Sequence, residues 1–480
     1  MAQPDRPSGG TGGTGTAQPD PLALLRSRSY LALLAVAGLL GVPVSAAAYG
    51  FLALVSYLQK ELFAHLPHGL GLHPVPAWWP LPVLVAGGIL AALAITRLPG
   101  NGGPSPAGGF KVHPPPAPAQ LPGVVLAALA TLCFGLVLGP EMPLIALGSG
   151  LAALAVKFAR RPVPDQGRSV IASAGSFAAI STLLGSPILG AFLLMEASGL
   201  GGAMLSLVLV PGLLAAGVGS LIFIGLDSLT GLGTFSLAIP GLPAFGRPDL
   251  AEFGWAVVIG LAAALAGSGL RWLGRLLQER AQRRTLVILP VAAAAVAGLA
   301  VAYTIATGKP VSDVLYSGQD ALGPLVTHAA TYSAGAVALL LACKALAYGL
   351  SLGSFRGGPI FPAMFLGAAG GVLLSHLPGL PLVAAVAMGI GAMSAVMLAL
   401  PLTSVLLATL LIASDGIKVM PLVIVAAVVA YVANARIAPG ELSPAGGGAR
   451  HGWPRERGAR GVSAEQHPPA GAGRQGDQQT

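Results

Sequence analysis

Apolar stretches long enough to cross a bilayer recur along most of the 480-residue chain, and many of them are interrupted by glycine, proline or serine. Hydrophobic residues make up 54% of the sequence and charged residues only 9%, whereas a soluble domain carries about 25% charge. Lipid tolerates broken or re-entrant helices only where protein or water satisfies the exposed backbone. We therefore expect an all-α membrane protein of many tilted and broken helices.

The distribution of apolar residues predicts three regions. Residues 1–28, rich in glycine, proline and threonine, are predicted to form a disordered tail and not a signal peptide, since no processing site follows the first apolar run. Residues 29–437 form the predicted transmembrane domain, with halves at about 29–225 and 250–437 and a span expected at Leu121–Leu138. Residues 438–480 are predicted to be a disordered basic tail without a folded regulatory domain.

The net charge of +9 is concentrated in tails and loops, which indicates orientation and lipid contact rather than nucleic-acid binding. The positive-inside tendency predicts that three basic clusters and both tails are cytoplasmic in a multi-pass plasma-membrane protein, although one cluster could instead coat a water-filled face. The three clusters are Lys157, Arg160, Arg161 and Arg168; Arg271, Arg275, Arg280, Arg283 and Arg284; and Arg450, Arg455, Arg457 and Arg460.

The sequence offers no cofactor site. Its eight histidines form no ligand pair at helical spacing, and we expect Cys133 and Cys343, both in apolar segments, to be small core residues. There is no nucleophile elbow, phosphate loop or metal-ligand cluster. We therefore expect no metal, no cofactor and no enzymatic activity.

An acidic residue interrupts the apolar stretch from Gly135 to Gly150. Glu141 is flanked by Pro140 and Pro143, which indicate a break followed by a helix start. Met142 and its neighbours would then present unpaired N–H groups, backed by the helix dipole, to a negative group. A carboxylate at membrane depth is costly and so marks a candidate site. The alternative is a glutamate that only caps the helix.

The two halves share a pattern of prolines. PLIALGSG begins at Pro143 and is followed by SPILGAFLLMEAS, which contains Pro187, while PAMFLGAAG begins at Pro362 and is followed by a helix opening at Pro401. In each half, one proline is predicted to open a small-residue helix and the next proline a second helix. Chance similarity between glycine-rich segments is the alternative. A true repeat would fit a transporter in which broken helices point their N-termini at a midplane anion site.

Four motifs, in order, resemble those of the CLC family of chloride channels and chloride/proton antiporters. They are GNGGP at 100–104 where the family has GSGIP, GPEMP at 139–143 where it has GREGP, SPILGAFLLMEAS at 186–198, and GGPIFPAMFLGAAGG at 357–371. The resemblance extends over roughly 30–437 and corresponds to the prokaryotic type without C-terminal CBS domains.

The resemblance implies two inverted-topology halves, a homodimer in the lipid bilayer with one pathway per subunit, and chloride or another halide as the transported ligand. It implies that Glu141 is a gating glutamate that competes with the anion for the same pocket. The implied anion-binding residues are Asn101, Gly102, Met142, Ile360 and Phe361. Helix N-termini would bind the anion without a fixed cation.

Three departures from the family pattern affect the expected anion preference. Asn101 stands where the family has an anion-coordinating serine, and its amide can donate but is larger. Pro359 removes one backbone N–H from the fourth motif. The inner-gate tyrosine has no match, because Tyr431 comes too early. Anion preference is therefore better founded than chloride preference, and a family scaffold that no longer conducts remains an alternative.

A fourth departure concerns proton coupling. Many family antiporters carry two adjacent acids at the end of the helix that here begins at Pro187, and this sequence has Glu196 followed by Ala197. Alanine cannot hold a proton, so the internal relay is missing. Glu196 is a candidate secondary acid, although a structural role tied to nearby amides is favoured. The sequence predicts passive anion conduction, with proton-coupled chloride or fluoride antiport as the alternative.

Overall fold

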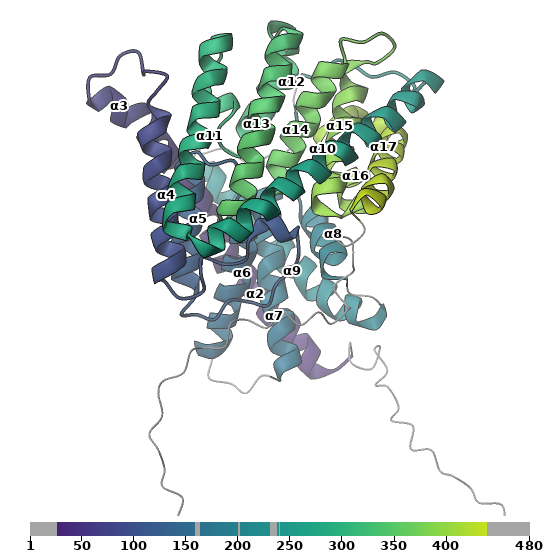
Figure 1. The fold of residues 1–480 in the computed structure, drawn as a ribbon. Coiled ribbons are helices and arrows are strands. Elements are labelled where there is room, and N and C mark those ends of the chain that lie inside the picture. The colour runs from purple at the N-terminus through teal and green to yellow at the C-terminus, as the bar shows by residue number, and fades with distance from the viewer. Residues whose placement is uncertain (1–25, 159–163, 200–201, 231–237, 240, 439–480) are drawn as a thin grey trace, which may run out of the picture. The chain divides into compact units, whose positions relative to one another are not determined.

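The computed structural model describes residues 26–158, 164–199, 202–230, 238–239 and 241–438. Among these residues every regular element is a helix, and a single β-bridge joins Gly139 to Gly358. Nine of the described helices are long and apolar enough to cross a membrane, and five shorter apolar helices accompany them (Figure 1). The predicted all-α architecture is confirmed. Most of the two predicted tails, and Arg160 and Arg161, lie outside the described residues.

The first half contains the helices α2 to α9. Its elements are α2 (Arg28–Lys60), the π-helix η1 (Glu61–His65), α3 (Leu66–Gly69), α4 (Pro80–Arg97), the 3-10 helix η2 (Pro106–Gly108), α5 (Leu121–Leu132), α6 (Glu141–Phe158), α7 (Asp165–Leu184), α8 (Pro187–Ser198) and α9 (Gly202–Thr230).

The second half contains the helices α10 to α17. Its elements are α10 (Leu250–Arg283), α11 (Thr285–Thr307), η3 (Val311–Asp313), α12 (Gln319–Thr327), η4 (Ala329–Thr331), α13 (Ala334–Ser354), α14 (Ile360–Leu374), α15 (Leu382–Leu398), α16 (Pro401–Leu411), η5 (Ala413–Asp415) and α17 (Gly416–Ile437).

The two halves repeat one order of helices in inverted orientation. Both α6 and α14 begin two residues after a bridged glycine, and each has a proline, Pro143 or Pro362, as its third residue. Both α8 and α16 begin at a proline, Pro187 or Pro401. Because the bridge is antiparallel, α6 and α14 leave it in opposite directions. The prolines are equivalent as predicted, although α6 and α14 start two residues before theirs.

Helix α5 is shorter than predicted. It ends at Leu132 and not at Leu138, and the chain turns at Gly135, whose φ is +91°. The irregular segment that follows is buried but keeps its backbone partners: the Val137 N–H donates to Ser351 Oγ at 3.1 Å, and the Gly135 carbonyl accepts from the Tyr316 N–H at 3.1 Å. These distant partners, which periodicity cannot reveal, allow non-helical chain at membrane depth.

Glycines allow the helix after each break to touch its neighbour at the backbone. Gly148 of α6 faces the Gly175 carbonyl of α7, and Gly367 of α14 faces the Gly389 carbonyl of α15; a Cβ at either position would overlap that carbonyl. Gly148 and Gly367 each lie seven residues after their helix start. Close packing of small residues is the main source of helix association in lipid, because lipid tails are as apolar as leucine.

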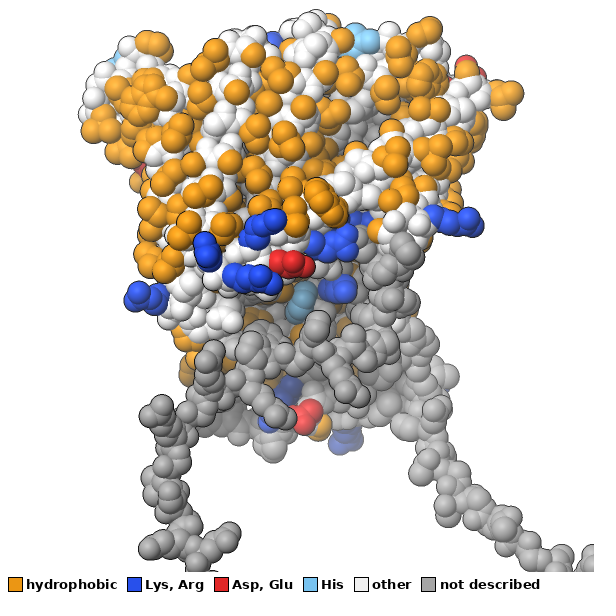
Figure 2. Space-filling model, viewed as in Figure 1, with side chains coloured by type: hydrophobic (Ala, Val, Ile, Leu, Met, Phe, Trp, Pro, Cys, Tyr) orange, Lys and Arg blue, Asp and Glu red, His pale blue; other side chains and the backbone are white. Residues whose placement is uncertain are grey.

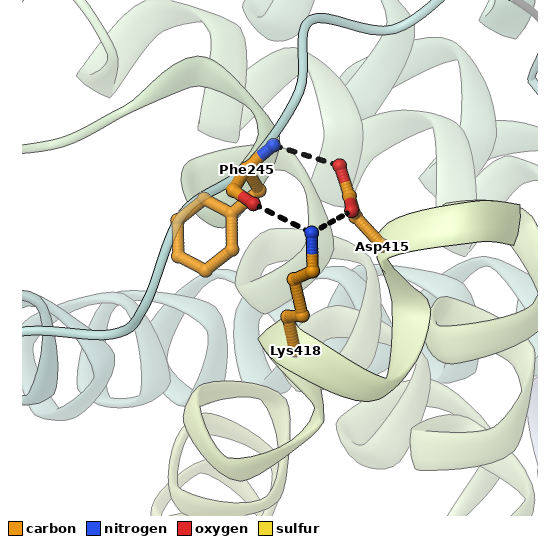
Figure 3. Close-up of polar contacts among 3 residues, drawn as sticks. All are labelled: Phe245, Asp415 and Lys418. Carbon is orange, nitrogen blue, oxygen red and sulfur yellow. Dashed lines mark hydrogen bonds and ion pairs between the residues drawn. The ribbon is translucent and has the colours of Figure 1, made fainter.

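The chain that enters the second half is tied to the corner between α16 and α17. As Figure 3 shows, the Phe245 N–H donates to Asp415 Oδ2 at 2.7 Å, and Lys418 Nζ donates to the Phe245 carbonyl at 3.1 Å and to Asp415 Oδ1 at 2.7 Å. The Ile239 N–H also donates to the Leu411 carbonyl at 3.0 Å. Since α10 begins only at Leu250, these contacts fix the entry to the second half against its last helices.

The outer surface suits a lipid environment. Figure 2 shows apolar side chains over the upper helices and lysine and arginine side chains gathered below them. Large apolar residues such as Leu265 of α10 and Val291 of α11 are exposed, and an apolar face of this extent is unfavourable in water. The second basic cluster lies on α10 and at its end, not in a loop, and Arg271 is buried, where it donates to Asn434 Oδ1.

The glycine crossing between α14 and α15 generates a prediction. Gly367→Ala should destabilise the protein by about 1–3 kcal/mol, because its methyl group would force the two backbones apart. Gly370→Ala is the matched control on the same helix, since a Cβ there meets no atom within 4 Å. Thermal unfolding of the purified protein in detergent measures both. Equal midpoints for the two variants would contradict the importance of this crossing.

Candidate functional site

The starts of α6 and α14 meet deep in the protein, at the Gly139–Gly358 bridge. The Gly139 N–H donates to the Gly358 carbonyl at 2.8 Å and the Gly358 N–H to the Gly139 carbonyl at 2.6 Å. Both helices therefore direct their first-turn N–H groups, which have no acceptor within the helix, toward one region. The helix dipoles add partial positive charge there. We call this region the cradle.

Glu141 occupies the cradle. Its side chain is fully buried, and its Oε1 accepts a hydrogen bond from the Phe361 N–H of α14 at 2.9 Å. Oε2 is buried and has no hydrogen-bond partner. A Cβ at Gly139 or Gly358 would overlap the carboxylate, so glycine at both positions leaves room for Glu141 in the cradle. A carboxylate from the first half is thus held by the helix start of the second half.

The structure brings three of the predicted anion-binding residues to the cradle. Ile360 and Phe361 are the first two residues of α14, and Met142 is the second residue of α6; all three are buried. Pro359 is the N-cap of α14, and its carbonyl accepts from Tyr348 Oη at 3.1 Å. Tyr348 therefore helps to fix the start of α14. Pro359 itself has no N–H to offer to the cradle.

The other two predicted residues lie in the loop after α4. Asn101 is exposed with φ +50°, and within the described chain its side chain has no hydrogen-bond partner. Gly102 is buried with φ +69°, and a Cβ there would lie 2.8 Å from Ala127 Cβ and 3.4 Å from Arg356 Cγ. Among the described residues this loop makes no hydrogen bond to Glu141. The loop instead lies against the chain just before the Gly358 bridge.

Glu196 is tied to the second half. Its carboxylate accepts from the Leu402 N–H at 2.9 Å, the Thr403 N–H at 2.7 Å and Thr403 Oγ1 at 2.6 Å. All three donors belong to the first turn of α16, whose dipole favours a negative group. The neighbouring Ala197 packs against the apolar core. Glu196 thus joins α8 to its counterpart α16.

A cavity of about 590 Å³ opens beside the cradle. Leu138 and Pro140, just before Glu141, form part of its wall, and Lys60, Asp313 and Tyr332 contribute polar groups. Asp313 is buried and accepts from Tyr303 Oη and Tyr332 Oη, each at 3.2 Å. Burial raises the pKa of Asp313 even though both tyrosines donate to it. The cavity therefore reaches the segment that immediately precedes Glu141.

Sequence reasoning missed two cations near the cradle. Lys344 of α13 is fully buried, donates to the carbonyls of Asp313, Val314 and Leu315 at 2.9–3.2 Å, and lies 4.3 Å from the Phe365 ring centre. Arg356 precedes the Gly357–Gly358 pair. Both could have been found in the sequence, because each is a charged residue beside or within an apolar stretch. The same criterion identified Glu141.

Comparison with known proteins gives concordant results. The family model described as "Voltage gated chloride channel" matches residues 83–435. Relatives named "Putative ion-transport protein YfeO", from Escherichia coli (strain K12 / DH10B) and Shigella boydii serotype 4 (strain Sb227), are each 31% identical over 366 residues. Each alignment covers 74% of this chain and 82% of the relative.

Solved structures share the fold. A slow cyanobacterial Cl-/H+ antiporter superposes with a TM-score of 0.69 at 17% identity, over 85% of this chain and 95% of its own. A CLC-type fluoride/proton antiporter gives a TM-score of 0.59 at 20% identity, over 84% of this chain and 95% of its own. Taken together with the family-model match over most of the chain, these likenesses show that the chain belongs to the CLC family of voltage gated chloride channels.

Proposed function

We propose that this protein carries an inorganic anion, chloride or another halide, passively across a membrane through a pathway gated by Glu141. Family membership supports anion transport by an integral, multi-pass membrane protein. The observation that carries the gating proposal is the position of the Glu141 carboxylate, which accepts the Phe361 N–H that an anion would otherwise accept. Carboxylate and anion are therefore alternative occupants of one place.

The contacts of Glu141 suit a gate that opens. One oxygen accepts a single backbone hydrogen bond, and the other is buried without a partner. A buried carboxylate oxygen without a hydrogen-bond partner is costly, and that cost is removed when the side chain leaves the cradle. Protonation removes the charge that the helix dipoles attract, and an anion can then replace the carboxylate.

We assign anion contacts to Met142, Ile360 and Phe361 at the cradle, with Asn101 and Gly102 at the approach from the α4–α5 loop. Helix N-termini offer partial charge, so the anion would bind strongly enough to enter and weakly enough to leave. All cradle residues come from one chain, so each subunit of a homodimer would carry a complete pathway. We assign Lys157 and Arg168, at the α6–α7 end, to the cytoplasmic side on the basis of the positive-inside tendency.

The passive mechanism is supported by the end of α8. Ala197 has no titratable group, and all three hydrogen bonds of Glu196 go to α16. Moving a proton through Glu196 would sacrifice these charge-assisted bonds, each worth about 1.5–3 kcal/mol. Proton-coupled antiport of chloride or fluoride is the alternative, and it requires a proton route that avoids this position.

The gate generates one prediction. Glu141→Ala should abolish the acid dependence of anion flux in liposomes and leave flux at least as high as in the acid-activated wild type, because the occupant of the cradle is gone. Glu279→Gln, an exposed acid on α10, is the control and should keep the wild-type pH response. If a folded Glu141→Ala variant responds to pH like the wild type, Glu141 is not the gate.

Proton coupling generates a second prediction. In a bilayer recording with a chloride gradient, the reversal potential should lie at the chloride equilibrium potential and should not shift when a pH gradient is imposed, because no acid replaces Ala197. Proteoliposomes carrying a pH-sensitive dye should show no proton uptake beyond that of protein-free vesicles. Proton movement in fixed proportion to chloride would instead establish antiport.

A further inference from the structure

Arg356 carries a charge that the protein leaves almost without partners. Its Nη1 donates only to the adjacent Phe355 carbonyl, at 3.2 Å, and its Nε is buried with no partner. No carboxylate lies within ion-pair distance of it among the described residues. An arginine stays ionised, and a partly buried charge without a counter-charge is destabilising. Such a group is explained if a ligand supplies the negative charge.

The surrounding residues hold Arg356 in place by its backbone and stem. Its N–H donates to Thr131 Oγ1 at 3.4 Å, and Thr131 is itself fixed by its bond to the Ala127 carbonyl at 2.9 Å. The aliphatic stem passes Gly102, where a Cβ would lie 3.4 Å from Arg356 Cγ. Thr131 and Gly102 therefore position the stem but do not neutralise the guanidinium.

Two hydroxyl groups on the segments that flank Arg356 and Gly102 in the chain are also unused. Ser354 Oγ, at the end of α13, and Ser105 Oγ, in the α4–α5 loop, are buried without hydrogen-bond partners. The loop reaches this region because η2, which follows Ser105, packs against α13 and α10. A guanidinium and two hydroxyl groups can all donate, and the guanidinium repels cations. Donors that lack an acceptor in the protein are the groups that a small anion can bind.

We propose that Arg356 is a fixed cation of the transport pathway, which binds the permeating anion on the α4–α5 loop side of the cradle before the anion reaches Glu141. This inference rests on the proposed function. Arg356 is two residues from Gly358, and on this proposal its site and the cradle are successive positions along one route. The full positive charge of Arg356 would raise the local concentration of anions. The partial charges of the helix starts would bind an anion at the cradle weakly enough for it to leave, as conduction through several sites requires.

The purely structural alternative is that Arg356 clamps the α4–α5 loop to the α13–α14 connection. A clamp would act through the backbone and stem contacts, which a long uncharged side chain largely keeps. An anion site depends on charge. Substitutions that separate length from charge therefore distinguish the two roles.

The test compares Arg356→Gln, Arg356→Lys and Arg97→Gln, the last removing an exposed charge at the end of α4, just before the same loop. Chloride binding is measured by calorimetry in detergent, and half-saturating chloride for flux is measured from each side of oriented liposomes. Arg356→Gln should weaken binding by roughly 10- to 100-fold, the equivalent of one charge-assisted hydrogen bond. Arg356→Lys should restore most of the affinity, and Arg97→Gln should match the wild type.

Arg356→Gln with wild-type chloride affinity and flux would overturn the proposal, as would equal weakening by Arg97→Gln. If Arg356→Gln fails to fold, anomalous diffraction from bromide-soaked wild-type crystals decides: bromide beside the guanidinium supports the site, and bromide confined to the cradle refutes it. Failure of the proposed function can be told apart from failure of the Arg356 site. It would appear as an unchanged pH response in the Glu141→Ala variant, which keeps Arg356.

Discussion

The antiparallel bridge between Gly139 and Gly358 is the contact on which the rest of the site depends. It joins two helix starts from opposite halves of the chain, so that α6 and α14 diverge from one point and both present unpaired N–H groups there. Two partial positive charges then converge where no side-chain cation is needed. The Glu141 carboxylate completes the arrangement by crossing from one half to the Phe361 N–H of the other.

Placing broken helices at membrane depth creates a second requirement, that each buried backbone group find a partner. The structure meets it with polar side chains of α13. Ser351 accepts the Val137 N–H, Tyr348 donates to the Pro359 carbonyl, and Lys344 donates to three successive carbonyls before α12. One helix thus supports the irregular segments on both sides of the cradle. This explains why an apolar helix carries so many polar groups.

The charges around the pathway fall into two classes. Lys344 and Glu196 have full sets of hydrogen bonds and hold elements together. Glu141 and Arg356 are under-satisfied, since each has a buried polar atom without a partner. Buried polar groups are normally paired, and at Glu141 and Arg356 we attribute the missing partner to the proposed anion. On the proposals made above, that distinction separates the charges that hold the fold together from those that meet the anion.

The sequence by itself determined the membrane class, predicted the equivalence of Pro143 with Pro362 and of Pro187 with Pro401, and identified Glu141 as an acid at a helix start within an apolar stretch. These features depend on local composition, helix-start chemistry and the cost of charge in lipid. Only the tertiary structure decided that α5 stops at Leu132, that the Glu141 carboxylate lies on Phe361, and that Arg356 lies against Gly102. Each of these depends on a partner more than 200 residues away or on a glycine that admits close approach, and no periodicity encodes either.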